Sequence, residues 1–169
     1  MFNEIQFFRQ KWIIILLLAV SAIPVFGLVY QLATGNPFGT SPMPNWGYIL
    51  VLIPILGLNL LIFKSNLKTT YDTMGLTYRF APFHFNATTI SWKEVDQIII
   101  RKYSPIKEYG GWGLRGMGKN RAFNVSRDIG VQLFLSDGRK ILFGTQKWQE
   151  IAKVFDKYNI AYTTHGINA

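Results

Sequence analysis

Charge is missing from a long stretch near the start of this chain, because no Asp, Glu, Lys or Arg lies between Lys11 and Lys64. The stretch contains two apolar segments, Trp12–Leu32 and Trp46–Phe63, joined by a short link, residues 33–45. The first segment has 21 residues, and as a helix it would span roughly 31 Å, which matches a bilayer core of about 30 Å. The second is shorter, close to the lower limit for a span. A soluble core would leave much of this surface exposed, so the sequence predicts a transmembrane helical hairpin.

Cysteine is absent, and histidine occurs only at His84 and His165. Without cysteine the chain can form neither a disulfide framework nor a thiolate metal site, which fits a reducing compartment. The two histidines are too few and too far apart in the sequence to suggest a metal site. We therefore expect no metal and no cofactor.

The charges that flank the uncharged stretch predict its orientation. Lys and Arg precede the first segment and follow the second, whereas the link has neither. The positive-inside rule places such flanks in the cytoplasm. We therefore expect a multi-pass protein of the cytoplasmic (inner) membrane, with residues 1–11 as a cytoplasmic N-terminus, the link 33–45 outside and residues 64–169 as a cytoplasmic domain. A cleaved signal peptide is the competing interpretation of the first segment, but its apolar run exceeds the usual length of about 7–15 residues and a second segment follows.

The part of the chain that follows the second apolar segment is strongly basic. Residues 64–169 hold 16 Lys or Arg against 8 Asp or Glu. A basic domain beside the inner leaflet is attracted to anionic lipid headgroups. Nucleic acid is the other polyanion that such charge serves, but a membrane tether keeps the domain away from most of it, so we expect no nucleic-acid partner. The alternative is that these basic residues serve only to keep the domain soluble and follow the positive-inside rule.

Short β-type runs dominate from Leu67 onward, and Asp137-Gly138 between two apolar runs predicts a tight hairpin. Thr145 is a candidate cap for a final helix, 146–158, whose Trp148, Ile151 and Phe155 share one face. The pattern predicts an α+β, mainly β domain, with a strongly bent sheet or partial barrel covered by the C-terminal helix.

The glycine-rich segment 109–121 is the most unusual one. It satisfies G-x-G-x-x-G, but the residues that follow are strand-like, whereas nucleotide loops need a helix there. One interpretation is structural: the glycines let a loop cross closely over a sheet, with Trp112 as its anchor. The other is functional, with backbone donors, rings and cations that contact an anionic or peptide ligand. The candidate binding residues are Tyr109, Trp112, Arg115, Lys119 and Arg121.

Catalytic signals are lacking elsewhere. The carboxylates are scattered, and no serine lies in a nucleophile elbow. No charge lies within the two apolar segments, which argues against a transporter. Asn59 is the one strongly polar residue of the second segment, and in lipid it needs a partner in the hairpin or in an oligomer.

Three motifs after the membrane suggest a family. Ile90–Ile98, Tyr109–Arg115 and the run Gly130–Leu133, Asp137-Gly138, Phe143–Gln146 resemble the membrane-anchored bacterial pleckstrin-homology-like (PH-like) proteins over about residues 67–160. The resemblance implies two roughly orthogonal antiparallel sheets capped by the C-terminal helix, and it carries no catalytic motif.

Two functions of different classes remain. The leading one is a non-enzymatic membrane protein whose cytoplasmic module binds a protein partner or assembles into a homo-oligomer. The alternative is a receptor for anionic lipid headgroups or a small anionic ligand, through the glycine-rich basic loop. Convergence of the loop cations in a pocket would favour the receptor, and their spread over a face would favour the partner.

Overall fold

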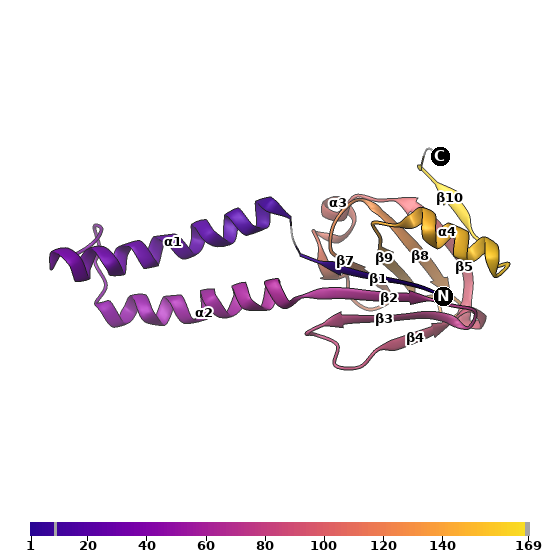
Figure 1. The fold of residues 1–169 in the computed structure, drawn as a ribbon, viewed down its shortest axis with the longest axis horizontal. Helices are drawn as coiled ribbons and strands as arrows, with labels where there is room; N and C mark the ends of the chain where they lie inside the picture. The colour runs from indigo at the N-terminus through magenta and orange to yellow at the C-terminus, as the bar shows by residue number, and fades with distance from the viewer. Residues whose placement is uncertain (9, 168–169) are drawn as a thin grey trace. The chain divides into compact units, whose positions relative to one another are not determined.

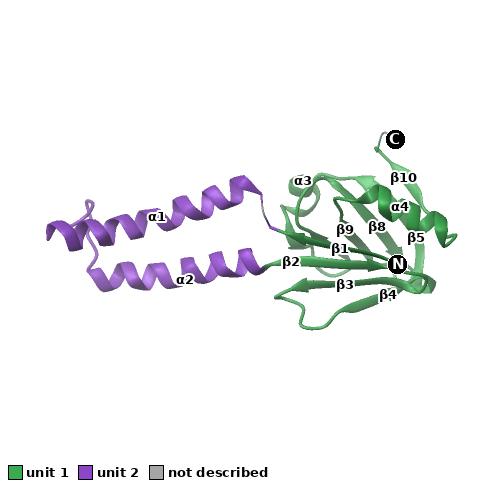
Figure 2. Ribbon diagram, viewed as in Figure 1, with its two compact units in different colours: residues 1–7, 65–169 green, residues 8–64 purple. Residues whose placement is uncertain are grey.

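The computed structural model describes residues 1–8 and 10–167, which divide into two units coloured separately in Figure 2. Unit 1 combines residues 1–7 with the chain from Ser65 onward, and unit 2 comprises Phe8–Lys64. Unit 1 is therefore built from two pieces of sequence, one on each side of the long uncharged stretch.

Unit 2 consists of two long helices, α1 (Lys11–Thr34) and α2 (Asn45–Lys64), which pack against each other. Both are long and apolar enough to cross a membrane. Few of their residues are buried by protein, and most large apolar side chains are exposed, including Leu18 at 63%. The structure thus confirms two helices of transmembrane length, slightly longer than the predicted segments.

The polar residue of α2 has its partner within this unit. Asn59 Nδ2 donates to Ser21 Oγ of α1 at 2.8 Å, and that hydroxyl donates to the Leu17 carbonyl at 2.8 Å. The two helices also approach closely near Gly27, where a Cβ would lie 2.6 Å from the Tyr48 ring. Of the two expected sources of a partner for Asn59, the hairpin itself supplies one.

A four-stranded antiparallel sheet opens unit 1 (Figure 1), in the order β1-β2-β3-β4. Its strands are β1 (Phe2–Phe7), β2 (Asn66–Tyr71), β3 (Gly75–Ala81) and β4 (Thr88–Ser91). The first two strands pair from Phe2↔Tyr71 to Phe7↔Asn66. The N-terminal segment, residues 1–11, which the sequence pattern separates from the domain, therefore contains a strand of it. The chain leaves and re-enters the sheet at the same end.

The second sheet has six strands in the order β10-β5-β8-β9-β7-β6. Its elements, with the helices around it, are η1 (Trp92–Glu94), β5 (Val95–Lys102), α3 (Pro105–Tyr109), β6 (Gly113–Arg115), β7 (Asn120–Asn124), β8 (Ile129–Leu135), β9 (Lys140–Gly144), α4 (Trp148–Lys157) and β10 (Thr163–His165). The predicted hairpin at Asp137-Gly138 is confirmed as β8–β9, with Gly138 at φ +79°. The expectation of antiparallel pairing throughout is wrong here, because β7–β9 and β10–β5 are parallel. The hairpin β6–β7 precedes β8 in sequence yet pairs beyond β9, which gives β7 the direction of β9.

The core lies between the sheets and is rich in aromatic rings. Phe123 and Phe143 stack at 5.3 Å, and Tyr78 lies 4.8 Å from each. Helix α4, drawn beside β1 and β8 in Figure 1, adds Ile151 and Phe155, both fully buried. The predicted amphipathic helix over the sheets is thereby confirmed.

Strand β1 carries two buried polar residues that contact the start of α4. Glu4 is 4% exposed and accepts from Thr145 Oγ1 at 2.6 Å and from the Gln146 amide at 2.8 Å. Burial is the main cause that raises the pKa of Glu4, against these hydrogen bonds. Gln6 Nε2 donates to the Gly144 carbonyl at 2.7 Å. β1 is therefore bonded to the β9–α4 corner as well as to β2.

The prediction that Thr145 caps the final helix is wrong. The helix begins at Trp148, and Lys147 occupies the cap position without a side-chain cap bond. Thr145 lies two residues earlier, where it accepts from the Lys147 amide at 2.9 Å and donates to Glu4. The partner that fixes this threonine comes from the other end of the chain.

Candidate ligand-binding site

The glycine-rich segment forms the end of α3 and the β6–β7 hairpin at the edge of the six-stranded sheet. Gly116 has φ +81°, and a Cβ there would lie 2.1 Å from the Asn120 carbonyl, so only glycine fits this turn. Trp112 is half-buried, and its Nε1 donates to the Arg127 carbonyl at 3.3 Å. The interpretation of a loop that crosses over the sheet is wrong, because the segment extends the sheet instead.

The three cations of this segment do not converge. Arg115 lies opposite Ala122 in the ladder, and Arg121 is the residue next to Ala122, so the two arginines point to opposite faces. Arg115 Nε donates to the Trp112 carbonyl at 2.9 Å. Lys119 is exposed in the β6–β7 turn. A ligand role for Trp112 and these cations stays a prediction, and only Tyr109 of the five candidate residues lines the pocket described next.

A pocket of about 460 Å³ lies on the face of the six-stranded sheet opposite the aromatic core. Its lining comes from β5, α3, β7, β8 and β9: Arg101, Glu108, Tyr109, Asn120, Gln132, Phe134 and Lys140. Residues on this face alternate with core residues such as Val131 and Leu133. The pocket is therefore built on a sheet whose other face is firmly packed.

The register of the strands and the short helix α3 bring the residues of the pocket lining together. Lys140 pairs with Asn120 on one side and with Phe134 on the other, which puts these three residues in one row across the sheet. Helix α3 starts at Ser104, whose Oγ accepts from the Lys107 amide at 3.4 Å. The left-handed Gly110 ends the helix after one turn, which brings Glu108 and Tyr109 to the pocket.

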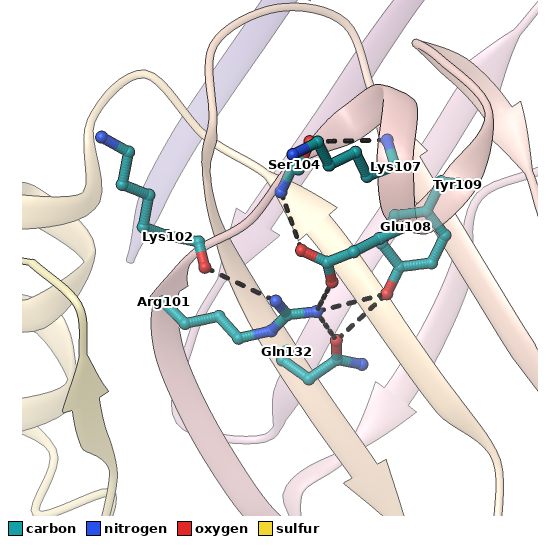
Figure 3. A network of polar contacts seen from close by, with 7 residues as sticks. All are labelled: Arg101, Lys102, Ser104, Lys107, Glu108, Tyr109 and Gln132. Carbon is teal, nitrogen blue, oxygen red and sulfur yellow. Dashed lines mark hydrogen bonds and ion pairs between the residues drawn. The ribbon is translucent and has the colours of Figure 1, made fainter.

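Arg101 is the centre of a polar network, shown in Figure 3. Its Nη2 lies 2.8 Å from Glu108 Oε2, 3.0 Å from Gln132 Oε1 and 3.5 Å from Tyr109 Oη. Glu108 Oε1 also accepts from the Ser104 amide at 2.7 Å. Burial opposes the charge of Glu108, but the bonds from Arg101 and Ser104 outweigh it and lower the pKa of this carboxyl. The positive charge of Arg101 is thus largely offset within the protein.

Two donors in the pocket lining have no acceptor within the described residues, and one of them is accessible. Gln132 is 3% exposed, and its Oε1 must face Arg101 because a guanidinium only donates. Its Nε2 has no hydrogen-bond partner among residues 1–8 and 10–167 and points away from the network in Figure 3. Lys140 Nζ lies 5.5 Å from the centre of the Phe134 ring, and no carboxylate in the described part of the chain pairs with it. The pocket therefore presents the exposed ammonium of Lys140, and its lining also contains the buried amide nitrogen of Gln132.

The titratable groups of the pocket are already engaged in part. Glu108 is held by Arg101, and no second carboxyl or imidazole lines the pocket to form an acid–base pair. Within the described residues, no group of three His, Asp or Glu side chains is placed to hold a metal ion. An unpaired buried donor costs about 1–3 kcal/mol, and Gln132 Nε2, which has almost no accessible surface, is such a donor in the pocket lining.

Sequence reasoning missed most of this pocket. Arg101, Gln132 and Lys140 lie on three strands that are far apart in sequence, and only the pairing of β5, β8 and β9 brings them to one face. The Asp137-Gly138 hairpin was the available signal, since its register places Lys140 beside Phe134. Neither a family model nor a curated protein matches this chain.

Proposed function

We propose that this chain is a non-enzymatic integral membrane protein whose cytoplasmic β-rich domain binds an acidic segment of a partner protein. The observation that carries the binding half is the pocket on the outer face of the six-stranded sheet, where the exposed Lys140 forms no ion pair with any residue that the structure describes.

The membrane half rests on the two helices and on the pairing of their flanks. The apolar side chains of α1 and α2 are mostly exposed, which suits a lipid environment and would be costly in water. Strand β1 ends just before α1, and β2 begins just after α2. Because β1 and β2 pair directly, both flanks lie on one side of the membrane. Their Lys and Arg residues favour the cytoplasmic side.

The domain is proposed to be PH-like. A four-stranded antiparallel meander, the antiparallel trio β5-β8-β9 and a following helix, α4, agree with the resemblance. Strands β6, β7 and β10 depart from it by adding to the edges of the second sheet, two of them in parallel. In this interpretation the membrane hairpin is an insertion between the first two strands.

A soluble partner fits the location of the pocket. The β8–β9 turn contacts η1, where the Ser136 amide donates to the Glu94 carbonyl at 3.0 Å. Element η1 follows Ser91, which pairs with Gly75 at the end of the four-stranded sheet opposite to Asn66. The Phe134–Lys140 end of the pocket is therefore remote from the chain ends that lead to the helices. This position favours an acidic protein segment over a lipid headgroup.

Site-directed crosslinking in intact membranes tests this function. The chain has no cysteine, so Asn120→Cys places a single photoreactive maleimide at the pocket. Arg121→Cys is the matched control, since the next residue of β7 points to the other face. We expect a discrete adduct from position 120 and none from position 121, with loss of the adduct in an added Lys140→Glu variant. Equal adducts from both positions, or an adduct that survives Lys140→Glu, would contradict the proposal.

A small anion is the second candidate ligand, favoured by Lys140 and Asn120 in the lining of a pocket of about 460 Å³. Glutamate or inorganic phosphate that binds the folded state would raise its melting temperature, because ligand binding stabilises by mass action. The full chain in detergent micelles is compared in each salt and in chloride at equal ionic strength. A shift that Lys140→Ala removes would favour this candidate, and no shift would exclude it.

A further inference from the structure

Two aromatic side chains project from the connection between β3 and β4, residues 82–87. Phe83 is 56% exposed and Phe85 is 87% exposed. Large rings seldom remain so accessible to water in a domain that has an aromatic core available to bury them. This connection is therefore a candidate surface for an apolar environment outside the protein.

The connection is braced, so the two rings are presented by an ordered segment. Between them, His84 turns inward, with its ring 5.9 Å from Tyr78 and 5.5 Å from Phe123. The His84 amide donates to the Phe80 carbonyl at 2.8 Å, and Arg79 Nε donates to the His84 carbonyl at 3.2 Å. Phe83 keeps one ring contact, with its centroid 5.9 Å from that of Phe80, and Phe85 is almost fully exposed.

The register of the four-stranded sheet locates this connection. Ala81, the last residue of β3, pairs with Asn66, the first residue of β2, and Asn66 pairs with Phe7, the last residue of β1. Residues 82–87 therefore leave the sheet at the end where the chain connects to both helices. Only Ser65 separates α2 from β2. This end of the sheet is therefore joined to α2 by a one-residue link.

The charges near this end suit an anionic bilayer. Lys68 on β2 and Arg79 on β3 are exposed and lie opposite each other in the strand register. Lys64 is the last residue of α2. Asp72, the acidic residue between Lys64 and the connection, lies in the β2–β3 turn at the other end of the sheet. Aromatic tips flanked by cations are the composition that membrane interfaces favour.

We propose that the β3–β4 connection inserts Phe83 and Phe85 into the headgroup region of an anionic bilayer, as a second attachment of the domain beside its helical hairpin. The inference rests on the membrane half of the proposed function. Together with the two short links to the helices, this contact fixes which end of the domain faces the lipid and leaves the outer-sheet pocket open to the aqueous phase.

Spin-label accessibility in the full chain tests this contact. A nitroxide on Ala87→Cys reports on the connection with both phenylalanines intact, in vesicles of phosphatidylglycerol and phosphatidylcholine. Met74→Cys is the control, because Met74 is 78% exposed in the turn at the opposite end of the same sheet. We expect the label at 87 to be more accessible to oxygen and less accessible to a water-soluble nickel complex than the label at 74. Phe85→Asp should remove this difference without unfolding the domain, because the ring is almost fully exposed.

The failure of this inference is distinguishable from failure of the membrane assignment. A label on Leu18→Cys, in the middle of α1, reports whether the helices lie in lipid. Lipid exposure at position 18 together with equal water exposure at 87 and 74, or a difference unchanged by Phe85→Asp, would overturn the loop contact alone. Water exposure at position 18 would overturn the membrane assignment and with it the loop contact.

Discussion

The two units differ in where their apolar side chains lie, which is mostly on the surface in unit 2 and in a packed core in unit 1. In unit 2 the leucines and isoleucines of α1 and α2 are mostly exposed, and the hydrogen bond from Asn59 to Ser21 joins the two helices away from their ends. In unit 1 the aromatic rings are packed against one another, and polar side chains such as Glu4 are buried with specific partners. Exposure that would be an error in water is expected in lipid, where no hydrophobic force drives the helices together. The difference suits a lipid environment for unit 2 and an aqueous one for unit 1.

The strand β1 makes unit 1 depend on residues that precede the helices, and its removal has the largest expected effect. Without β1, the Thr145 hydroxyl, the Gln146 amide and the Gly144 carbonyl lose their partners, at about 1–3 kcal/mol each when buried. We expect residues 65–169 alone to lack a cooperative thermal transition. Residues 1–7 joined to 65–169 by a short Gly-Ser linker should show one by circular dichroism. Identical melting of the two fragments would mean that β1 is dispensable.

The second-largest loss of stability is expected from truncation of one buried ring in unit 1. Phe155→Ala should destabilise unit 1 by about 3–5 kcal/mol, since the ring is fully buried and lies 5.8 Å from Tyr71 and 5.6 Å from Trp92. Leu18→Ala in α1, which removes an exposed side chain, should leave the same transition unchanged. The measurement is near-ultraviolet circular dichroism of the full chain on heating in micelles. An unaltered transition for Phe155→Ala would show that α4 is not part of the core.

Buried Glu4 predicts a smaller, pH-dependent effect. Burial raises the pKa of Glu4 in the folded state above its ordinary value near 4.5. The contribution of Glu4 to stability is therefore fully present below that ordinary value and is lost as the pH rises through the folded pKa. Glu4→Gln, which cannot titrate, should flatten this part of the stability profile measured by denaturant unfolding. An identical pH dependence in the two proteins would contradict the assignment.

The smallest effect is expected within unit 2. Asn59→Leu removes the bond to Ser21, and such contacts contribute on average about 0.6 kcal/mol in membrane helices. Unfolding of the helices in mixed SDS micelles should shift slightly, whereas Leu60→Ala at the neighbouring exposed position serves as the control. A shift for Asn59→Leu no larger than that for the control would show that this bond does not hold the helices together.

The sequence predicts the elements whose signals are local. Absence of charge marks both long helices, Asp137-Gly138 marks the β8–β9 hairpin, and the spacing of Ile151 and Phe155 marks α4. Strand β1 was missed because its pattern is inverted: Glu4 and Gln6 are buried, whereas Ile5 and Phe7 are exposed. Its buried polar groups become favourable only through partners such as Thr145, which lies at the other end of the chain.

The candidate site was predicted even less well. The basic residues of the glycine-rich segment predicted a binding site there. Arg115 on β6 and Arg121 on β7, however, point to opposite faces of the sheet. The pocket instead depends on the register of four strands, which places Lys140 between Asn120 and Phe134. Local composition carries no information about such cross-strand neighbours, so only Tyr109 was identified.

In the proposed function, one cytoplasmic domain is assembled from both flanks of a spanning hairpin. Because the chain has no cysteine, single cysteines at Gly39, in the link between the helices, and at Met74, in unit 1, can each be treated with a membrane-impermeant maleimide on intact cells. The account predicts that Gly39→Cys is labelled in intact cells and that Met74→Cys is labelled only after the membrane is permeabilised. Labelling of Met74→Cys in intact cells, or protection of Gly39→Cys there with labelling after permeabilisation, would contradict it.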